Sequence, residues 1–250
     1  MTKDESIRLA HDIALVKKRE KWFKRWRFLA LLFIIIYGFS LMPTDEPDLS
    51  HIAIVNIDGT ISEQSIFWED LKRINSDTKG LLVVMNSPGG FVGASERLYN
   101  TIEDLKSRMP VELLVEQSAT SGAYLAALGS DKIYAYNGSI IGSIGVVYSS
   151  YLTKGFLETY GIEREMITTG LYKGYPNQYE KMPEEIRDNF QELLDRTNDW
   201  FLSLVQDRRS LPSLSDIQEA QVYVASEALE KGLIDGISTR EQRVNALKKV

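Results

Sequence analysis

The sequence predicts a layered α/β domain with a mainly parallel sheet, preceded by one N-terminal apolar helix. Beyond residue 50, short apolar runs typical of strands alternate with segments of helical periodicity. Before residue 43, a basic segment precedes an uncharged apolar run. The 250 residues include no cysteine and two histidines, which excludes a thiol nucleophile, a disulfide framework and thiolate metal sites. The net charge of −6 gives no indication of nucleic-acid binding.

The first 50 residues carry a charge split and a candidate membrane segment. Residues 1–27 have a net charge of +5, and the rest of the chain has −11. The apolar run 28–42, taken as a helix, spans about 22 Å, against about 30 Å for a hydrocarbon core. We predict an uncleaved transmembrane anchor at 28–42, a basic cytoplasmic segment at 1–27 and a polar linker at 43–50.

Two other interpretations of the apolar run compete with the anchor. A cleaved signal peptide needs a small-x-small site, and the following LMPTDEPD contains none. A buried core helix would leave the basic flank without an explanation. The basic stretch 5–20 has helical spacing of its own, which fits a helix on the inner membrane surface and a plain solvated helix equally well.

The remaining elements form one domain, 51–250. Apolar runs predict strands, and periodic segments predict helices. The expected strands are 51–57, 80–85, 111–115, 132–136 and 164–167, and the expected helices are 94–108, 121–128, 153–160 and 184–207. Alternating strands and helices favour parallel pairing through right-handed crossovers, with active sites at the strand-to-helix turns.

Three glycine-rich turns are candidates for chemistry. The pair Gly89-Gly90 in NSPGG lets a ligand approach exposed backbone N–H groups. Ser121 opens a small-residue helix, where the N–H of Gly122 can face a developing oxyanion. Ser143, in IGSIGV, can hold a lysine by a hydrogen bond. Each turn alone also fits an ordinary structural role, namely a strand-to-helix turn, a serine N-cap and a glycine-rich connection.

A serine nucleophile needs a base, and the histidines are badly placed for it. His11 precedes the apolar run, and His51 begins the first predicted strand. The remaining common solution is a lysine whose pKa is lowered by burial. The candidates are Lys132, Lys154, Lys173 and Lys181. Glycines flank Lys173 on both sides, but spacing alone does not separate it from Lys154, and each lysine also fits a solvated surface position.

Four motifs in order give the chain a family resemblance. NSPGG (86–90), SATSGAY (118–124), IGSIGV with GIEREMITTGLYKG (141–146 and 161–174) and VYVASEALEKGLIDGI (222–237) resemble the signal peptide peptidase A family of membrane-anchored serine proteases over about 51–245. The resemblance implies a fold similar to the crotonase and caseinolytic protease superfamily. It implies a dyad of Ser121 and Lys173, with Ser143 orienting the lysine and the amides of Gly90 and Gly122 forming the oxyanion hole.

The chain departs from the family pattern at three positions. Thr120 precedes the nucleophile where alanine is more common, and Ala123 replaces a second glycine after it. Gly174 follows the lysine in place of an acid. These departures affect the expected shape of the substrate pocket more than the dyad.

The resemblance also implies the activity and its setting. We expect an ATP-independent serine endopeptidase without a cofactor or metal, acting on cleaved signal peptides or other hydrophobic membrane-derived segments. No G-x-x-x-x-G-K-[ST] loop is present. The expected partners are peptides, the lipid bilayer and further copies in a ring-like homo-oligomer, a tetramer or an octamer, without nucleic acid. The expected location is the bacterial inner membrane, with the N-terminus cytoplasmic and the protease domain periplasmic or otherwise extracytoplasmic.

Two other functions compete with the peptidase. One is crotonase-type acyl-CoA chemistry on a similar fold, and the other is a catalytically inactive oligomeric membrane scaffold. A covalent adduct of Ser121 with a serine-directed probe separates the peptidase from both.

Overall fold

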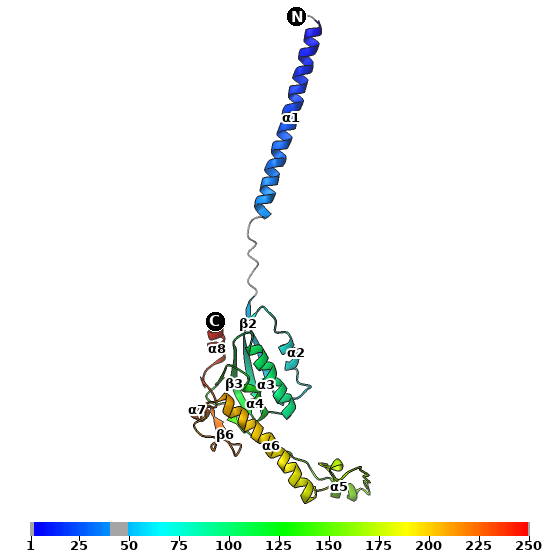
Figure 1. Cartoon of the computed structure of the whole chain (residues 1–250), viewed down its shortest axis with the longest axis vertical. Coiled ribbons are helices and arrows are strands. Elements are labelled where there is room, and N and C mark those ends of the chain that lie inside the picture. The colour runs from blue at the N-terminus through cyan, green and yellow to red at the C-terminus, as the bar shows by residue number, and fades with distance from the viewer. Residues whose placement is uncertain (1–2, 41–49, 250) are drawn as a thin grey trace. The chain divides into compact units, whose positions relative to one another are not determined.

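The computed structural model describes residues 3–40 and 50–249, in two units divided near residue 49. The first unit consists of α1 (Lys3–Ser40), a continuous helix that carries the basic segment and most of the apolar run (Figure 1). Among the described residues, no helix combines the length and the apolar composition needed to cross a bilayer. The last two residues of the predicted anchor and residues 43–49 of the predicted linker lie outside the described residues.

The second unit is built on a mainly parallel sheet, as the sequence predicts. Its described strands are β1 (His51–Asp58), β2 (Thr78–Ser87), β3 (Val111–Thr120), β4 (Lys132–Ala135), β5 (Ile140–Gly142), β6 (Val222–Val224) and β7 (Gly236–Ile237). The order β1-β2-β3-β4-β7 is parallel throughout. β5 runs parallel to the end of β3, and β6 is antiparallel to β5.

Helices cover both faces of this sheet. The described helices of this unit are α2 (Phe67–Lys72), α3 (Val92–Lys106), α4 (Gly122–Ala127), α5 (Lys154–Thr159), α6 (Glu184–Arg208), α7 (Ala225–Glu230) and α8 (Arg240–Leu247), of which α5 lies away from the sheet (Figure 1). Along β2, Leu81 and Val83 point into the main core with α3 and α4, whereas Leu82 and Val84 pack against Leu247 of α8. Burial on both faces explains why this strand is a continuous apolar run in the sequence.

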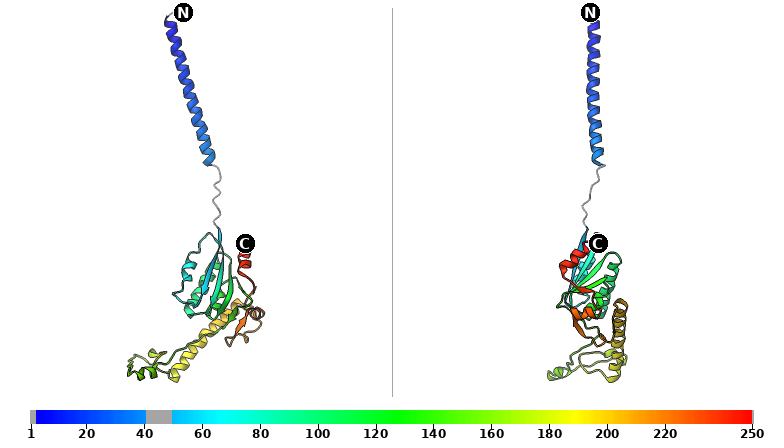
Figure 2. Two further views of the ribbon diagram at one scale, coloured as in Figure 1. Left: turned by 180° about the vertical axis from the view of Figure 1, so that it is seen from behind. Right: turned by 90° about the vertical axis from the view of Figure 1, so that its left-hand side faces the viewer.

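Residues 147–183 form an arm that projects, with the start of α6, from the sheet (Figures 1 and 2). The arm contains α5, which confirms the helix predicted at 153–160, and a short 3-10 turn at Leu171–Gly174. The strand predicted at 164–167 is wrong, because these residues are exposed and adopt no regular structure. A short segment such as REMI forms a strand only where a neighbouring strand supplies backbone partners, and the arm has none among its described residues.

The GLIDG segment, 232–236, connects α4 to the sheet and to the end of α6. The Tyr124 hydroxyl of α4 donates a hydrogen bond to Leu233 O at 2.8 Å. The Asp235 carboxylate accepts from the backbone N–H of Ile133 and from Arg209, both at 2.8 Å. This motif therefore has a structural role, which is to fix the helix that begins next to Ser121.

Candidate active site

Ser121 lies at the junction where β3 ends and α4 begins. Its backbone has φ +52° and ψ −128°, a conformation that is costly for any residue with a Cβ. The Ser121 N–H donates to Gly142 O at 2.8 Å, which secures the junction to β5. The side chain makes no capping hydrogen bond, so the alternative of an ordinary serine N-cap does not hold. Its Oγ lies 3.5 Å from Gly145 O.

The glycine turn after β2 packs directly on the backbone of Gly122. A Cβ built on Gly89 would lie 2.8 Å from Gly122 N, and one built on Gly122 would lie 3.3 Å from Gly90 N. A Cβ on Gly90 would meet Ile61 O at 2.0 Å. All three positions therefore exclude a side chain, and the sequence-predicted residues Gly90 and Gly122 are brought together beside Ser121.

The N–H groups of the two predicted oxyanion-hole residues, Gly90 and Gly122, have no hydrogen-bond acceptor in the part of the chain that the structure describes. In the bridge between Ile61 and Gly90, the hydrogen bonds run from Ile61 N–H to Gly89 O and from Phe91 N–H to Ile61 O. The N–H of Gly90 takes part in neither. Gly122 is the first residue of α4, where a backbone N–H has no acceptor within the helix. Both donors are thus available to a ligand at Ser121.

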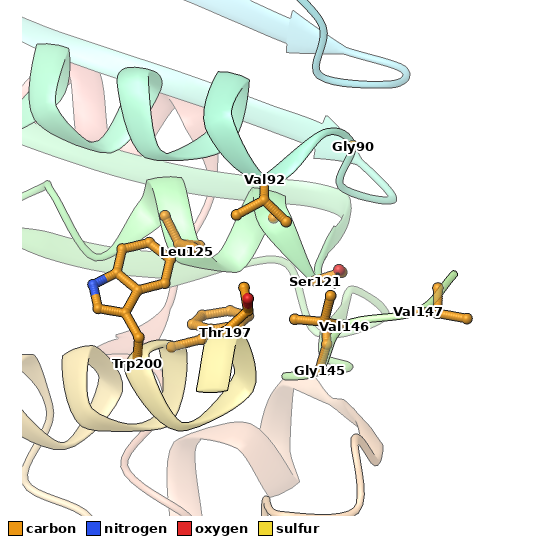
Figure 3. Close-up of a pocket in the computed structure, with 11 residues that line it drawn as sticks. Gly90, Val92, Ser121, Leu125, Gly145, Val146, Val147, Thr197 and Trp200 are labelled. Atoms are coloured by element: carbon orange, nitrogen blue, oxygen red, sulfur yellow. Dashed lines mark hydrogen bonds between the residues drawn. The ribbon is translucent and has the colours of Figure 1, made fainter. Parts of the chain in front are cut away.

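A cavity of about 80 Å³, lined by both polar and apolar atoms, adjoins Ser121, Gly90 and Gly122. α3 and α4 contribute Val92 and Leu125, and the other walls come from Val146, Val147, Thr197, Trp200 and Phe201. In Figure 3, Ser121 and Val146 lie at one end of this pocket and Trp200 and Leu125 at the other. No ionisable side chain is among its lining residues, all of which belong to the described part of the chain.

Ser143 lies close to this site along the chain and in space. It follows Gly142, whose carbonyl binds the N–H of Ser121, and it has φ +50°. Its own N–H donates to Gln221 O at 2.7 Å, and its side chain is half-buried. Two serines with left-handed backbone conformations thus stand on adjoining strand ends.

The predicted base, Lys173, is not in this site within one chain. It lies exposed in the 3-10 turn of the arm and is not among the residues that line the pocket. The other candidates do not line it either. Lys132 pairs with Asp235 at 3.3 Å, Lys154 lies 4.0 Å from Glu158 within α5, and Lys181 is exposed ahead of α6.

His51 is also remote from Ser121. It begins β1, whereas the glycine turn and Ser121 lie at the carboxyl ends of the neighbouring parallel strands. The length of one such strand, about 23 Å for seven residues at 3.3 Å each, separates the two edges. This placement agrees with the sequence-based argument against a Ser-His-Asp triad.

Two parts of the site are not predictable from the sequence. The first is the wall that α6 supplies through Thr197 and Trp200, which helical periodicity alone cannot assign to a particular neighbour. The second is Ser95 of α3, a buried serine directly behind Gly122. A small polar residue within an amphipathic helix carries no distinguishing pattern, so no sequence signal marked it.

The chain is similar to known peptidases in its amino-acid sequence. The family model described as Peptidase family S49 matches residues 103–250. A protein of Methanocaldococcus jannaschii that is named as a protease is 35% identical over 184 residues, covering 73% of this chain and 58% of its own. A protein of Enterococcus faecium that is named as signal peptide peptidase SppA is 31% identical over 188 residues. The match covers 73% of this chain and 55% of the relative. The chain thus spans somewhat over half the length of these two curated relatives.

A solved structure confirms the predicted fold class. A ClpP1 mutant from Listeria monocytogenes aligns with 76% of this chain and 94% of its own, with a TM-score of 0.51 and 16% sequence identity. At this identity the likeness concerns the fold alone. The predicted caseinolytic-protease-like α/β layering is therefore correct.

Proposed function

Because the chain belongs to peptidase family S49, we propose that it is a serine endopeptidase in which Ser121 is the nucleophile. One observation carries the proposal. Ser121 is held in a strained backbone conformation at the edge of a pocket, beside two glycine amides that have no hydrogen-bond acceptor among the described residues. Strained, non-glycine residues of this kind cluster at active sites, where the surrounding structure holds the side chain in place.

The proposed reaction is acyl transfer through a Ser/Lys dyad. Neutral Lys173 accepts the proton of Ser121 Oγ as that oxygen forms a bond to the scissile carbonyl carbon. The resulting oxyanion accepts hydrogen bonds from the N–H groups of Gly90 and Gly122. Protonated Lys173 then gives its proton to the leaving amine, and a water molecule hydrolyses the acyl-enzyme. The Ser143 hydroxyl orients the Lys173 amine.

The proposal includes a second copy of the chain, whose arm supplies Lys173. The arm exposes several large apolar side chains to solvent, which is typical of a surface that is covered by a partner. Val147 is 86% exposed, Tyr151 91% and Ile167 89%. A head-to-tail contact that places this arm on a neighbouring domain would bury these groups and bring Lys173 toward that neighbour's Ser121. Repetition of such a contact closes a ring, in keeping with the expected homo-oligomer.

Apolar peptides are the proposed substrates. The pocket presents the side chains of valines, Leu125, Trp200 and Phe201, and it has no ionisable side chain that would pair with a charged residue. An apolar residue on the acyl side of the scissile bond would fill it. Cleaved signal peptides and other hydrophobic membrane-derived segments meet this requirement.

We further propose that α1 holds the chain at the bacterial inner membrane, with the basic segment cytoplasmic and the protease domain outside the cytoplasm. The apolar part of α1 is exposed along consecutive positions, among them Phe28, Phe33 and Ile34 at 67%, 70% and 65%. Exposed apolar side chains on successive positions favour a lipid environment. The preceding basic residues follow the positive-inside pattern.

Extraction of membranes at alkaline pH tests this anchor. The full chain should sediment with the membranes, and the double variant Ile34→Lys, Ile35→Lys should be released. Ile66→Lys is the matched control, because Ile66 is an exposed apolar residue of the second unit, at 84%. Release of the unaltered chain would contradict the anchor.

Labelling with a fluorophosphonate probe, followed by peptide mapping, tests the nucleophile. The probe should attach to Ser121, and both Ser121→Ala and Lys173→Ala should lose labelling and peptide cleavage while remaining folded. Lys181→Ala, an exposed lysine of the same arm, should retain both. A folded chain that never labels and cleaves no peptide would favour the scaffold, and turnover of an acyl-CoA thioester without labelling would favour crotonase-type chemistry.

A further inference from the structure

Ser95 is a buried hydroxyl whose partner is missing in the resting structure. It lies in the first turn of α3 with no exposed surface, and its Oγ has no hydrogen-bond partner among the described residues. The backbone around it is fixed, since Ser95 N–H donates to Phe91 O at 2.9 Å. A buried hydroxyl without a partner lowers stability, so its presence calls for a reason.

Other buried serines of the domain differ from Ser95 in this respect. Ser87 accepts from Gly89 N–H at 3.1 Å, and Ser139 donates to Val115 O at 2.8 Å. Both of these hydroxyls have no exposed surface, as Ser95 has none. The fold therefore provides partners for buried serines elsewhere, and the exception is located at the candidate oxyanion hole.

The position of Ser95 connects it to both predicted oxyanion donors. A Cβ built on Gly122 would lie 2.2 Å from Ser95 Oγ and 3.3 Å from Gly90 N. Ser95 Oγ therefore lies next to the Gly122 backbone and near the Gly90 amide, and the hydroxyl itself is closed to solvent. In such a dry environment a rotatable O–H dipole acts on a nearby charge more strongly than it would in water.

We propose that Ser95 is a positioning residue of the oxyanion hole. Its hydroxyl occupies the space behind Gly122, fixes the spacing of the Gly90 and Gly122 amides, and turns its O–H dipole toward the oxyanion when the tetrahedral intermediate forms. Ser95 does not touch the substrate: it acts by holding the two amides in place and by the direction of its O–H dipole. This inference rests on the proposed serine peptidase function.

The test compares the variant Ser95→Ala with a control variant at another buried serine, both in the full-length chain. Ser95→Ala should lower kcat about tenfold, which is less than the loss from removing a direct oxyanion donor, and leave KM within about twofold. Affinity for a peptide aldehyde, which forms a tetrahedral adduct with Ser121, should fall by about the same factor as kcat. The melting temperature should stay level or rise, because the variant removes an unpartnered hydroxyl.

Two further variants make the result specific. Ser95→Cys keeps a weak donor and should recover part of the lost kcat. Ser238→Ala removes a buried hydroxyl remote from the site, one that donates to Gln242 at 3.1 Å, and should lower the melting temperature without changing kcat.

Three results would overturn the inference, in distinguishable ways. Wild-type kcat and aldehyde affinity in Ser95→Ala would refute it while leaving the peptidase intact. A fall in kcat accompanied by a lower melting temperature and a raised KM would assign Ser95 a packing role instead. Absence of fluorophosphonate labelling of Ser121 in the unaltered chain would refute the proposed function, and this inference with it.

Discussion

At the scale of single residues, the conformation of Ser121 is the most informative feature of the molecule. A positive φ at a residue with a Cβ costs free energy, and Ser121 has no capping hydrogen bond to offset that cost. The bond from its N–H to Gly142 O and the close glycine contacts hold it there. The site therefore stores strain at the side chain that we propose as the nucleophile.

Replacing Ser121 with glycine should stabilise the protein and inactivate it. Since glycine adopts positive φ without strain, Ser121→Gly should raise the free energy of unfolding by about 1 kcal/mol and abolish peptide cleavage. Urea unfolding measures the first effect. Ser130→Gly, at a serine with ordinary φ that donates to Ala127 O at 2.8 Å, should instead lower stability. A destabilised Ser121→Gly variant would show that the backbone at this position carries no strain.

At the scale of elements, α6 shows what helical periodicity can and cannot predict. The helix predicted at 184–207 is present at Glu184–Arg208, since Phe201 and Val205 follow the expected apolar spacing into the core. The placement of Thr197 and Trp200 over the Ser121 pocket depends on tertiary packing and carries no local signal. Periodicity therefore predicted the helix but not its part in the site.

Shortening Trp200 should broaden the choice of substrates. Trp200→Ala enlarges the pocket, so the ratio of kcat/KM for a peptide with phenylalanine next to the scissile carbonyl over one with alanine should rise about tenfold. Competition between the two peptides measures this ratio. Leu193→Ala, an exposed position of the same helix that does not line the pocket, should leave it unchanged. An unaltered ratio in Trp200→Ala would remove α6 from the substrate pocket.

The GLIDG segment predicts a defined dependence of stability on pH. Burial raises the pKa of Asp235, but hydrogen bonds from Ile133 N–H and Arg209 outweigh it, so the net pKa lies below its ordinary value. The ionised form is thus favoured by folding. Its contribution is complete above an unfolded pKa of about 4 and is lost as the pH falls through the lower folded pKa.

Asp235→Asn should therefore lower the free energy of unfolding at pH 7 and change it little in acid. We expect a loss of roughly 1–3 kcal/mol in the free energy of unfolding at pH 7, which shrinks below about pH 4. Denaturant unfolding at pH 7 and pH 3 checks this difference. Asp70→Asn, which breaks an exposed pair with Arg73, should cost under about 0.5 kcal/mol at both pH values. An equal loss at both pH values in Asp235→Asn would contradict the assignment.

At the scale of the whole molecule, the sequence predicts the sheet domain well and the arm poorly. Buried parallel strands leave continuous apolar runs, and the glycine pair after β2 and the Ser121-Gly122 junction stand out as motifs in the amino-acid sequence. Residues 164–167 (REMI) include two charged side chains and have no neighbouring strand among the described residues, so the strand expected there does not form. The order of motifs places Lys173 after Ser143 in the chain but does not reveal that the two lie on separate parts of the fold.

The separation of Lys173 from Ser121 makes assembly a requirement of the proposed mechanism. One chain supplies the proposed nucleophile, the two glycine amides and a pocket without an ionisable side chain. The same chain presents Lys173 on an exposed arm rich in apolar side chains. Both halves of the proposed dyad are therefore present in every copy, and each active site would combine the halves of two copies.

Mixing two inactive variants tests this central claim most directly. Ser121→Ala retains Lys173, and Lys173→Ala retains Ser121, so random reassembly of equal amounts should restore about a quarter of wild-type peptidase activity in a head-to-tail ring. Each variant alone should stay inactive, and fluorophosphonate labelling in the mixture should be confined to the Lys173→Ala chains. Mixed assemblies that form but remain inactive would contradict an active site shared between copies.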